Sequence, residues 1–257
     1  MNRLDPEDRE NVIFVDPNGE IFSNKPELKN GVKKYEFIGN NTYKSDSGET
    51  VVGPGEPSEP TQPFDSNFQQ GIENPDNSSI PPQVGGSGPY RRVYSNNGYS
   101  WVSAYVTLPG GTNIKDDNLG TNKDTGYVYF GGWGATNVGI DAGMQHSSTY
   151  DNWAPSTLAN GTMLTDATRY KPGQDIYMEF YVTATNEATL SVSGVTTSGV
   201  SKTTAIVRSG VSGWTKDGNG VRLKRMTTIG TYNYNSSNVT LNYINAGEET
   251  VSIQANG

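Results

Sequence analysis

The 257-residue sequence lacks cysteine and contains a single histidine, His146. A chain without cysteine forms no disulfide scaffold, thiolate zinc site or iron–sulfur cluster, and it has no cysteine nucleophile. A single imidazole also excludes, within one chain, metal sites that need two or three histidines, including the HExxH type. Several classes of thiol and metal chemistry are therefore removed before any motif is considered.

Charge is also scarce. Charged residues make up 18% of the chain, and 19 basic against 27 acidic residues give a formal net charge of −8. An acidic surface repels nucleic acids and anionic membranes, so we expect neither as a partner. No apolar run approaches the roughly 20 residues that a membrane-spanning helix requires.

The start of the chain has no apolar signal-peptide core in residues 1–7. Two locations remain: the cytosol, or the outside of the cell after a signal peptide has been removed. Low charge, abundant Asn, Ser, Thr, Gly and Tyr, and a proline-rich segment are typical of extracellular bacterial proteins. We therefore expect a secreted or cell-surface protein.

The residues that are plentiful predict turns and strands. Glycine (31), proline (14) and tyrosine (15) are abundant, whereas leucine is rare, so few helices can form. We expect an N-terminal hairpin segment over residues 1–52, built around the Asn18-Gly19 turn. A Pro/Gly-rich linker or strap follows over 53–88, and a β-sandwich domain over 89–257.

The last of these parts is a succession of short β segments separated by turn residues. We predict strands at 90–95, 99–108, 126–132, 137–145, 175–184, 188–193, 203–208, 221–229, 239–245 and 250–254. So many strands without a helical period between them predict an all-β fold, an antiparallel β-sandwich of the jelly-roll type.

Alternation within four of these strands separates two faces. One face is aliphatic and predicts the core of the sandwich. The other, which we place on a single sheet, combines aromatic rings with carboxylate and amide groups. Its candidate ligand-binding residues are Tyr99, Trp101, Tyr105, Tyr127, Tyr129, Trp133, Asp141, Gln145, Tyr177, Glu179 and Tyr181.

Such a face suits carbohydrate. Aromatic rings cover the apolar side of a sugar ring, while carboxylates and amides bind its hydroxyl groups. Two other interpretations remain open. Residues 1–88 could pack against this face and satisfy the tyrosine hydroxyls, or the aromatic residues could be there because they suit strands.

Three stretches of the sequence carry a resemblance to a known family: residues 127–133, YVYFGGW, residues 138–145, VGIDAGMQ, and residues 152–155, NWAP. These stretches resemble secreted proteins of Gram-positive bacilli of the YrpD kind, which look like members of the concanavalin A-like lectin/glucanase superfamily. The resemblance would cover about residues 90–257. It implies a jelly roll whose concave sheet binds carbohydrate, sometimes with catalysis and often with a structural Ca²⁺.

Catalytic candidates are few. The glucanase motif of that superfamily is absent, but Glu179 and Asp141 lie on the proposed face and could form a carboxylate pair for glycoside hydrolysis. His146 with a tyrosine would suit a lyase, except that Gln145 and His146 are adjacent and point oppositely. The glycines at 131–132 precede a strand, so they are not a phosphate cradle and instead allow a ligand or strand to approach.

Calcium is the favoured metal. Asp116, Asp117, Asn118, Asn122 and Asp124 offer hard oxygen ligands at short spacing in the loop between two strands of the proposed ligand sheet. The ion would act as a structural clip. The alternative is a polar loop that uses Asx turns.

Three functional hypotheses follow. The first is a non-catalytic, lectin-like protein that binds a polysaccharide or oligosaccharide, as a monomer. The second is a glycoside hydrolase or lyase that uses the same face. The third is a structural module of the cell envelope whose aromatic face is covered by its own N-terminal segment.

Overall fold

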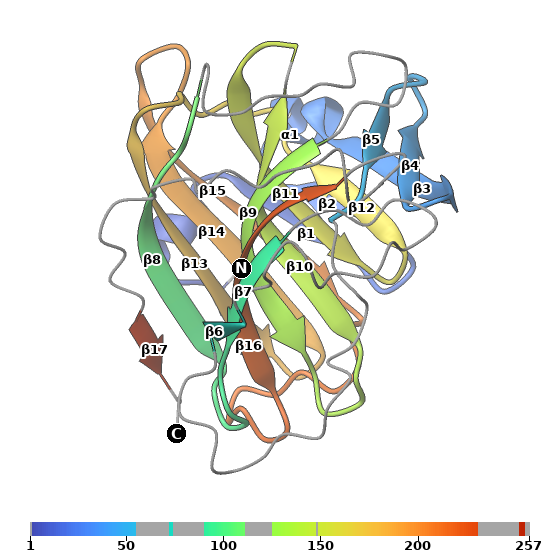
Figure 1. Cartoon of the computed structure of the whole chain (residues 1–257), viewed down its shortest axis with the longest axis vertical. Coiled ribbons are helices and arrows are strands. Elements are labelled where there is room, and N and C mark those ends of the chain that lie inside the picture. The colour runs from blue at the N-terminus through green and yellow to red at the C-terminus, as the bar shows by residue number, and fades with distance from the viewer. Residues whose placement is uncertain are drawn as a thin grey trace.

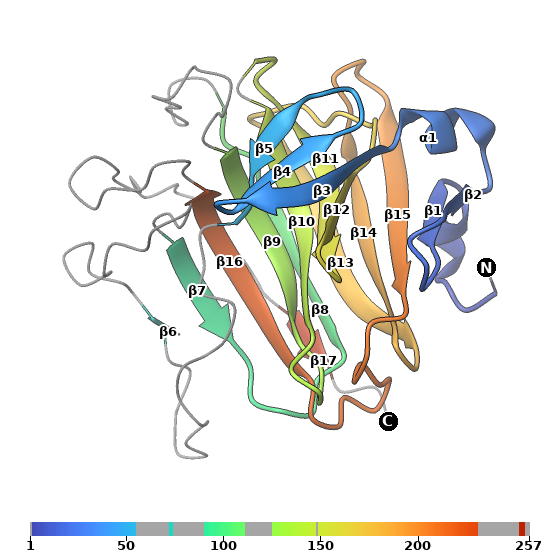
Figure 2. The same cartoon turned by 90° about the vertical axis from the view of Figure 1, so that its right-hand side faces the viewer.

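The computed structural model describes residues 2–54, 72–73, 90–110, 125–147, 149–230 and 252–254. Two β-sheets, A and B, stack face to face (Figures 1 and 2), so the predicted all-β sandwich is confirmed. The jelly-roll connectivity stays a prediction.

Sheet A has seven strands, ordered β17-β8-β13-β14-β15-β1-β2. In that order they span Ser252–Gln254, Trp101–Thr107, Asp175–Ala184, Glu187–Val195, Ser201–Ser209, Val12–Val15 and Ile21–Ser23. Neighbours are antiparallel except β1 and β15, which are parallel.

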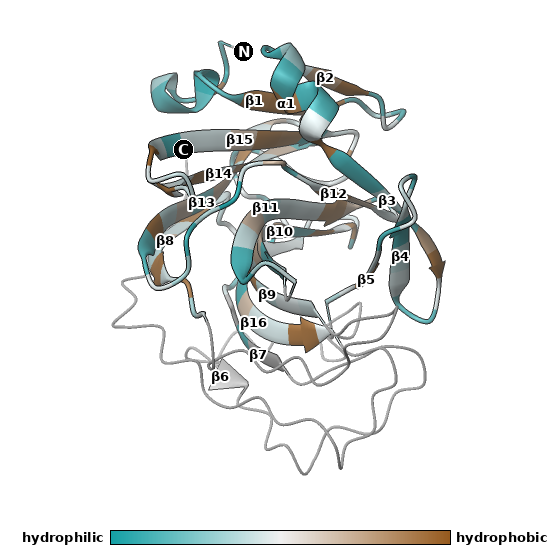
Figure 3. Cartoon of the chain, turned by 90° about the horizontal axis from the view of Figure 1, so that it is seen from above, coloured by the Kyte–Doolittle hydropathy of each residue, from teal (hydrophilic) through white to brown (hydrophobic). Residues whose placement is uncertain are grey.

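Sheet B has ten strands, ordered β5-β4-β3-β12-β11-β10-β9-β16-β7-β6. In that order they span Thr50–Val52, Thr42–Ser45, Lys33–Gly39, Thr162–Thr165, Asn152–Ala159, Gly139–Ser147, Thr125–Trp133, Arg222–Gly230, Tyr90–Tyr94 and Ile72–Glu73. The sheet curls, so that β3–β5 come round toward β9 and β16 (Figure 3). The Val52 amide donates to Oγ1 of Thr125, and the Tyr127 hydroxyl donates to the Val52 carbonyl, 2.5 Å away.

The main core lies between the sheets and consists of the predicted aliphatic face. It includes Val102, Ala104, Val106, Val128, Phe130, Ile140, Ala142, Met144, Ile176, Met178, Phe180 and Val182, all buried. Trp153 and Trp214 complete it from segments for which no strand was predicted. The indole Nε1 atoms donate to the carbonyls of Pro109 and Val138, which satisfies the one polar group that each ring brings into the core.

Residues 2–52 contribute strands to both sheets. The predicted hairpin is confirmed as β1–β2, whose turn is closed by Asp16 accepting from the backbone amides of Asn18 and Glu20. The hairpin extends sheet A through β15, while β3–β5 extend sheet B through β12. Two short helices, η1 (Pro6–Arg9) and α1 (Pro26–Gly31), begin with proline, which is pre-organised for a first helical turn. The N-terminal residues are thus part of the sandwich framework.

Candidate functional site

The predicted aromatic face is divided between the two sheets. Strands β8 and β13 pair in sheet A, whereas β9 and β10 pair in sheet B. Their aliphatic residues meet in the shared core, so their aromatic residues point away from it on opposite sides of the molecule. The prediction of one continuous face was therefore wrong. Alternation fixes the faces of each strand, but it carries no information about which strands pair.

In sheet B the tyrosines are covered by the chain itself. A second buried cluster fills the concave side of the sheet and contains Tyr35, Tyr43, Val51, Tyr127, Tyr129, Met163 and Met226. We call it the tyrosine cluster. The Tyr129 hydroxyl contacts Sδ of Met226 at 3.4 Å, and Gln145 accepts from Oγ1 of Thr165 at 3.1 Å. Burial raises the pKa of the Tyr127 hydroxyl well above its usual value. These predicted ligand residues therefore form a second core here.

Beside this cluster, Trp133 is buried among cations. Lys224 Nζ lies 4.7 Å from the indole centroid, and the guanidinium carbons of Arg92 and Arg222 lie 5.5 Å and 5.6 Å from it. Lys224 also forms an ion pair of 2.7 Å with Asp141. Trp133 is only 2% exposed, so its indole is occupied by these side chains. Sequence reasoning missed Arg222 and Lys224, although their two-residue spacing in β16 was a signal that they share a face.

Two glycines in β9 position this group. Gly131 and Gly132 have φ of +126° and +139°, and a Cβ atom at either would lie 1.9 Å from a carbonyl oxygen of a neighbouring strand. That close approach brings β10 and β16 tightly against β9, and with them Asp141 and Lys224. Of the two expected reasons for these glycines, a close ligand or a close strand, the structure shows the close strand: β10 at Gly131 and β16 at Gly132.

The outer face of sheet A carries exposed aromatic rings. Tyr105 on β8 and Tyr177 on β13 are direct cross-strand partners, and their ring centroids are 5.1 Å apart. Tyr105 is 64% exposed, whereas Trp101 and Tyr177 are half-buried. We call Trp101, Tyr105 and Tyr177 the aromatic platform. It is the part of the predicted face that remains accessible to a ligand.

Glu179 anchors this platform from below. Its Oε2 atom accepts from the Trp101 indole Nε1 and from the Tyr177 hydroxyl, each at 3.2 Å. The carboxyl group is buried, and this burial together with the nearby charge of Asp8 raises the pKa of Glu179 to about 7. Near neutral pH the group therefore exists in both protonation states.

The N-terminal arm covers a neighbouring part of this face. Asp8 of η1 accepts hydrogen bonds from the hydroxyls of Tyr181 and Ser191. Tyr181, another predicted ligand residue, is buried with Leu4 there. Carboxylate oxygens of Asp5, Asp8 and Glu179 lie within 4.8 Å of one another, close enough in principle to share a cation. Burial raises the pKa of Asp8, and the nearby negative charges raise it further.

Other predicted residues have different surroundings. Tyr99 packs against the main core, so it does not belong to the ligand face. Glu179 and Asp141 lie on opposite sides of the sandwich, which excludes them as a catalytic pair. His146 is buried, with Nε2 3.1 Å from Oδ1 of Asp151 and its ring tilted by 54° against that of Trp153, with centroids 5.0 Å apart.

The predicted calcium ligands, Asp116, Asp117, Asn118, Asn122 and Asp124, lie outside the described residues. Their loop was expected to connect two strands of one sheet. It connects β8 of sheet A with β9 of sheet B, so that expectation was wrong for the same reason as the single face.

The fold and the site together define an all-β sandwich protein with an exposed aromatic platform above a buried carboxyl group. Within the described residues, no helix has the length and apolar character needed to cross a membrane. No protein-family model and no curated protein matches the sequence.

Solved structures give low similarities. Two crystal structures of scytalido-glutamic peptidase, both with transition-state analogues, match at TM-scores of 0.40 and 0.42 with 13% and 12% identity. The alignments cover 56% and 66% of this chain, and 65% and 82% of the peptidase chains. An alginate lyase from Aplysia kurodai matches at a TM-score of 0.28 and 6% identity, over 56% of this chain and 85% of the lyase. Similarities at this level assign no activity.

Proposed function

We propose that this protein binds carbohydrate without chemical turnover, through the outer face of sheet A. The observation that carries the proposal is the exposed Tyr105 ring packed against the half-buried Tyr177, which Glu179 links to Trp101 by hydrogen bonds. The rings of Trp101 and Tyr177 are fixed by these hydrogen bonds, so they lose little freedom on binding because they are already oriented.

Polar groups follow the rings along β13. Asp175, Tyr177 and Glu179 alternate onto one face, and Asp175 accepts from Oγ1 of Thr107 at 2.6 Å at the exposed end. For a sugar ring stacked on Tyr105, the Asp175 carboxylate would be the group that accepts hydrogen bonds from the sugar hydroxyls. With carboxyl groups on this face and a net charge of −8, neutral or amino sugars fit better than uronates.

The extracellular location and the membership of the concanavalin A-like superfamily are part of the same proposal. They rest on composition and on the resemblance of residues 127–155, and a carbohydrate ligand agrees with both. The concave side of sheet B is not included, because its tyrosines are covered by β3–β5.

Calorimetry with soluble cell-wall and plant polysaccharides tests this proposal. Tyr105→Ala should weaken binding by on the order of 1–3 kcal/mol, as for other stacking sites, while the protein stays folded and its melting temperature falls by no more than a few degrees. Phe37→Ala is the matched control, because Phe37 is an exposed aromatic residue on β3 of the other sheet. Absence of binding across the panel, or equal losses in both variants, would contradict the proposal.

A glycoside hydrolase is the second candidate, and the pKa of Glu179 favours it. A carboxyl group with a pKa of about 7 suits a general acid near neutral pH. Release of reducing ends that disappears in Glu179→Gln, with binding retained, would establish the hydrolase. Binding without any release would establish the lectin-like function.

A further inference from the structure

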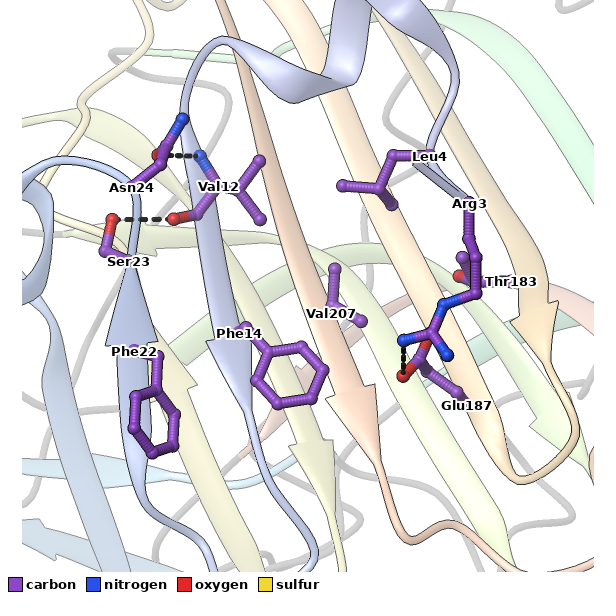
Figure 4. Close-up of a pocket in the computed structure, with 10 residues that line it drawn as sticks. All are labelled: Arg3, Leu4, Val12, Phe14, Phe22, Ser23, Asn24, Thr183, Glu187 and Val207. Atoms are coloured by element: carbon purple, nitrogen blue, oxygen red, sulfur yellow. Dashed lines mark hydrogen bonds and ion pairs between the residues drawn. The ribbon is translucent and has the colours of Figure 1, made fainter. Parts of the chain in front are cut away.

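A pocket of about 320 Å³ lies on sheet A, and none of the three residues of the aromatic platform lines it (Figure 4). Its walls come from the N-terminal arm, the β1–β2 hairpin and strands β13–β15. The lining residues are Arg3, Leu4, Val12, Phe14, Phe22, Ser23, Asn24, Thr183, Glu187 and Val207. The volume is at the lower end of the range for small-molecule sites, so the pocket suits a small ligand.

Most of the wall is apolar. Leu4, Val12 and Val207 are buried in one cluster, against which Phe14 packs. The rings of Phe14 and Phe22 lie side by side with centroids 6.3 Å apart, and Phe22 is 47% exposed at the mouth. This side of the pocket offers surface for a ring or a branched aliphatic group.

Several polar residues of the lining are already engaged. Oγ of Ser23 donates to the Val12 carbonyl, and Oδ1 of Asn24 accepts from the Val12 amide, so both hold the hairpin together. Oγ1 of Thr183 is bonded to Oγ1 of Thr189. The polar character available to a ligand therefore comes chiefly from the charged pair Arg3 and Glu187.

That pair is asymmetric. Nη2 of Arg3 lies 3.0 Å from Oε2 of Glu187, but the Glu187 side chain is 5% exposed whereas the Arg3 side chain is 56% exposed. Glu187 is fixed in strand β14, while Arg3 reaches it from the terminal arm. A carboxylate kept from water benefits from a cationic partner, and an exposed arginine side chain can leave at small cost.

We propose that this pocket binds a small amphiphilic amine. The apolar body lies between Phe14, Phe22 and Leu4, and the ammonium group pairs with Glu187 in place of Arg3. A carboxylate ligand would bring a second negative charge toward Glu187 in a protein of net charge −8, so the pocket selects the cation. This inference is independent of carbohydrate binding, since the aromatic platform does not line the pocket.

Matched probes test the charge requirement. Titrations of 2-phenylethylamine, 2-phenylethanol and 3-phenylpropionate, followed by two-dimensional NMR of the full chain, compare similar bodies with cationic, neutral and anionic ends. We expect the amine to shift the signals of Leu4, Phe22 and Val207, with the other two probes at least tenfold weaker. Equal binding of all three probes, or binding of the amine elsewhere, would overturn the proposal.

Variants separate ligand recognition from folding. Glu187→Gln preserves shape and should weaken the amine at least tenfold, whereas Arg3→Ala removes the competing cation and should strengthen it severalfold. Glu36→Gln, an exposed change on β3, should have no effect. Thermal melting identifies a variant that fails to fold. An Arg3→Ala variant that stays folded and loses amine binding would contradict the displacement, as would unchanged affinity in Glu187→Gln.

Discussion

The outer face of sheet A and the concave face of sheet B arise from the same sequence pattern. Each alternates tyrosine and tryptophan with a carboxylate. In sheet A the pattern leaves Tyr105 exposed, whereas in sheet B it forms the buried tyrosine cluster. The difference comes from what packs against each face. Strands β3–β5, at one edge of sheet B, curl over its concave face, whereas the terminal arm covers only part of sheet A. An aromatic face in a sequence therefore predicts either a ligand surface or a second core.

The two faces also differ in charge. The carboxyl groups of sheet A, Glu179 and Asp8, have each other as neighbours, and their pKa values are raised. The carboxylate of sheet B, Asp141, is paired with Lys224 beside further cations. Four changes, taken from the largest expected effect to the smallest, test this contrast.

The largest effect should come from the tyrosine cluster. Tyr129→Ala removes a ring that is 2% exposed and leaves a cavity, so we expect a loss of about 3–5 kcal/mol in unfolding free energy. Tyr105→Ala, the matched change on sheet A, should cost less than about 1 kcal/mol because that ring is mostly in solvent. Urea denaturation measures both. Similar losses in the two variants would show that the faces do not differ as described.

Next is the buried ion pair of sheet B. Lys224→Met leaves Asp141 without its ammonium partner and removes a cation from Trp133, so we expect a loss of about 2 kcal/mol. The double variant with Asp141→Asn should recover part of this loss, because the carboxylate charge that Lys224 paired with is then removed. A thermodynamic cycle from urea denaturation gives the coupling, and strictly additive losses would mean that the pair contributes nothing.

The third change concerns Glu179 of sheet A. Its effect on the unfolding free energy should depend on pH in the opposite sense to that of a salt-bridged acid. Because the folded pKa of Glu179 is about 7 against an ordinary value of 4.5, the folded state binds more protons between these pH values. Its contribution to stability is present below pH 4.5 and is lost as pH rises toward 7. Glu179→Gln should therefore become more stable than the wild type with rising pH, by about 1–2 kcal/mol at pH 8.

A second variant checks that this slope belongs to Glu179. The Tyr177 hydroxyl lowers the Glu179 pKa by bonding its charged form, so Tyr177→Phe should steepen the fall in stability with pH. Chemical denaturation at a series of pH values measures the difference from the wild type. A difference for Glu179→Gln that is independent of pH would contradict the assignment.

The smallest effect concerns the connection between the two faces. If Asp117 and its neighbours bind Ca²⁺ in the segment that joins β8 to β9, millimolar calcium should raise the melting temperature by a few degrees. Asp117→Asn should abolish that rise, with Asp46→Asn as the control on another loop. Superimposable melting curves with calcium and with a chelator would show that the segment holds no ion.

Much of the framework follows from sequence because alternation and turn chemistry are local. The strand around Asp175–Ala184 was predicted at its observed bounds, and its aliphatic residues are in the core. Strand β11 was not predicted, and it contains Pro155, a residue type that is uncommon inside sheet strands. Strand pairing joins distant segments, so the division into two faces and the pocket at Glu187 were beyond local patterns.

The parallel pairing of β1 with β15 has a consequence for how the chain reaches this structure. Val12 lies opposite Ala205, so about 190 residues of chain separate the two paired strands. Contacts of such sequence separation form slowly, because a long loop must close before any pairing compensates for it. The hairpin and the arm that carries Arg3 and Asp8 should therefore dock late in folding. Until then, Glu179, Glu187 and the apolar wall between them face water, and hydrogen-exchange labelling during refolding would detect that interval.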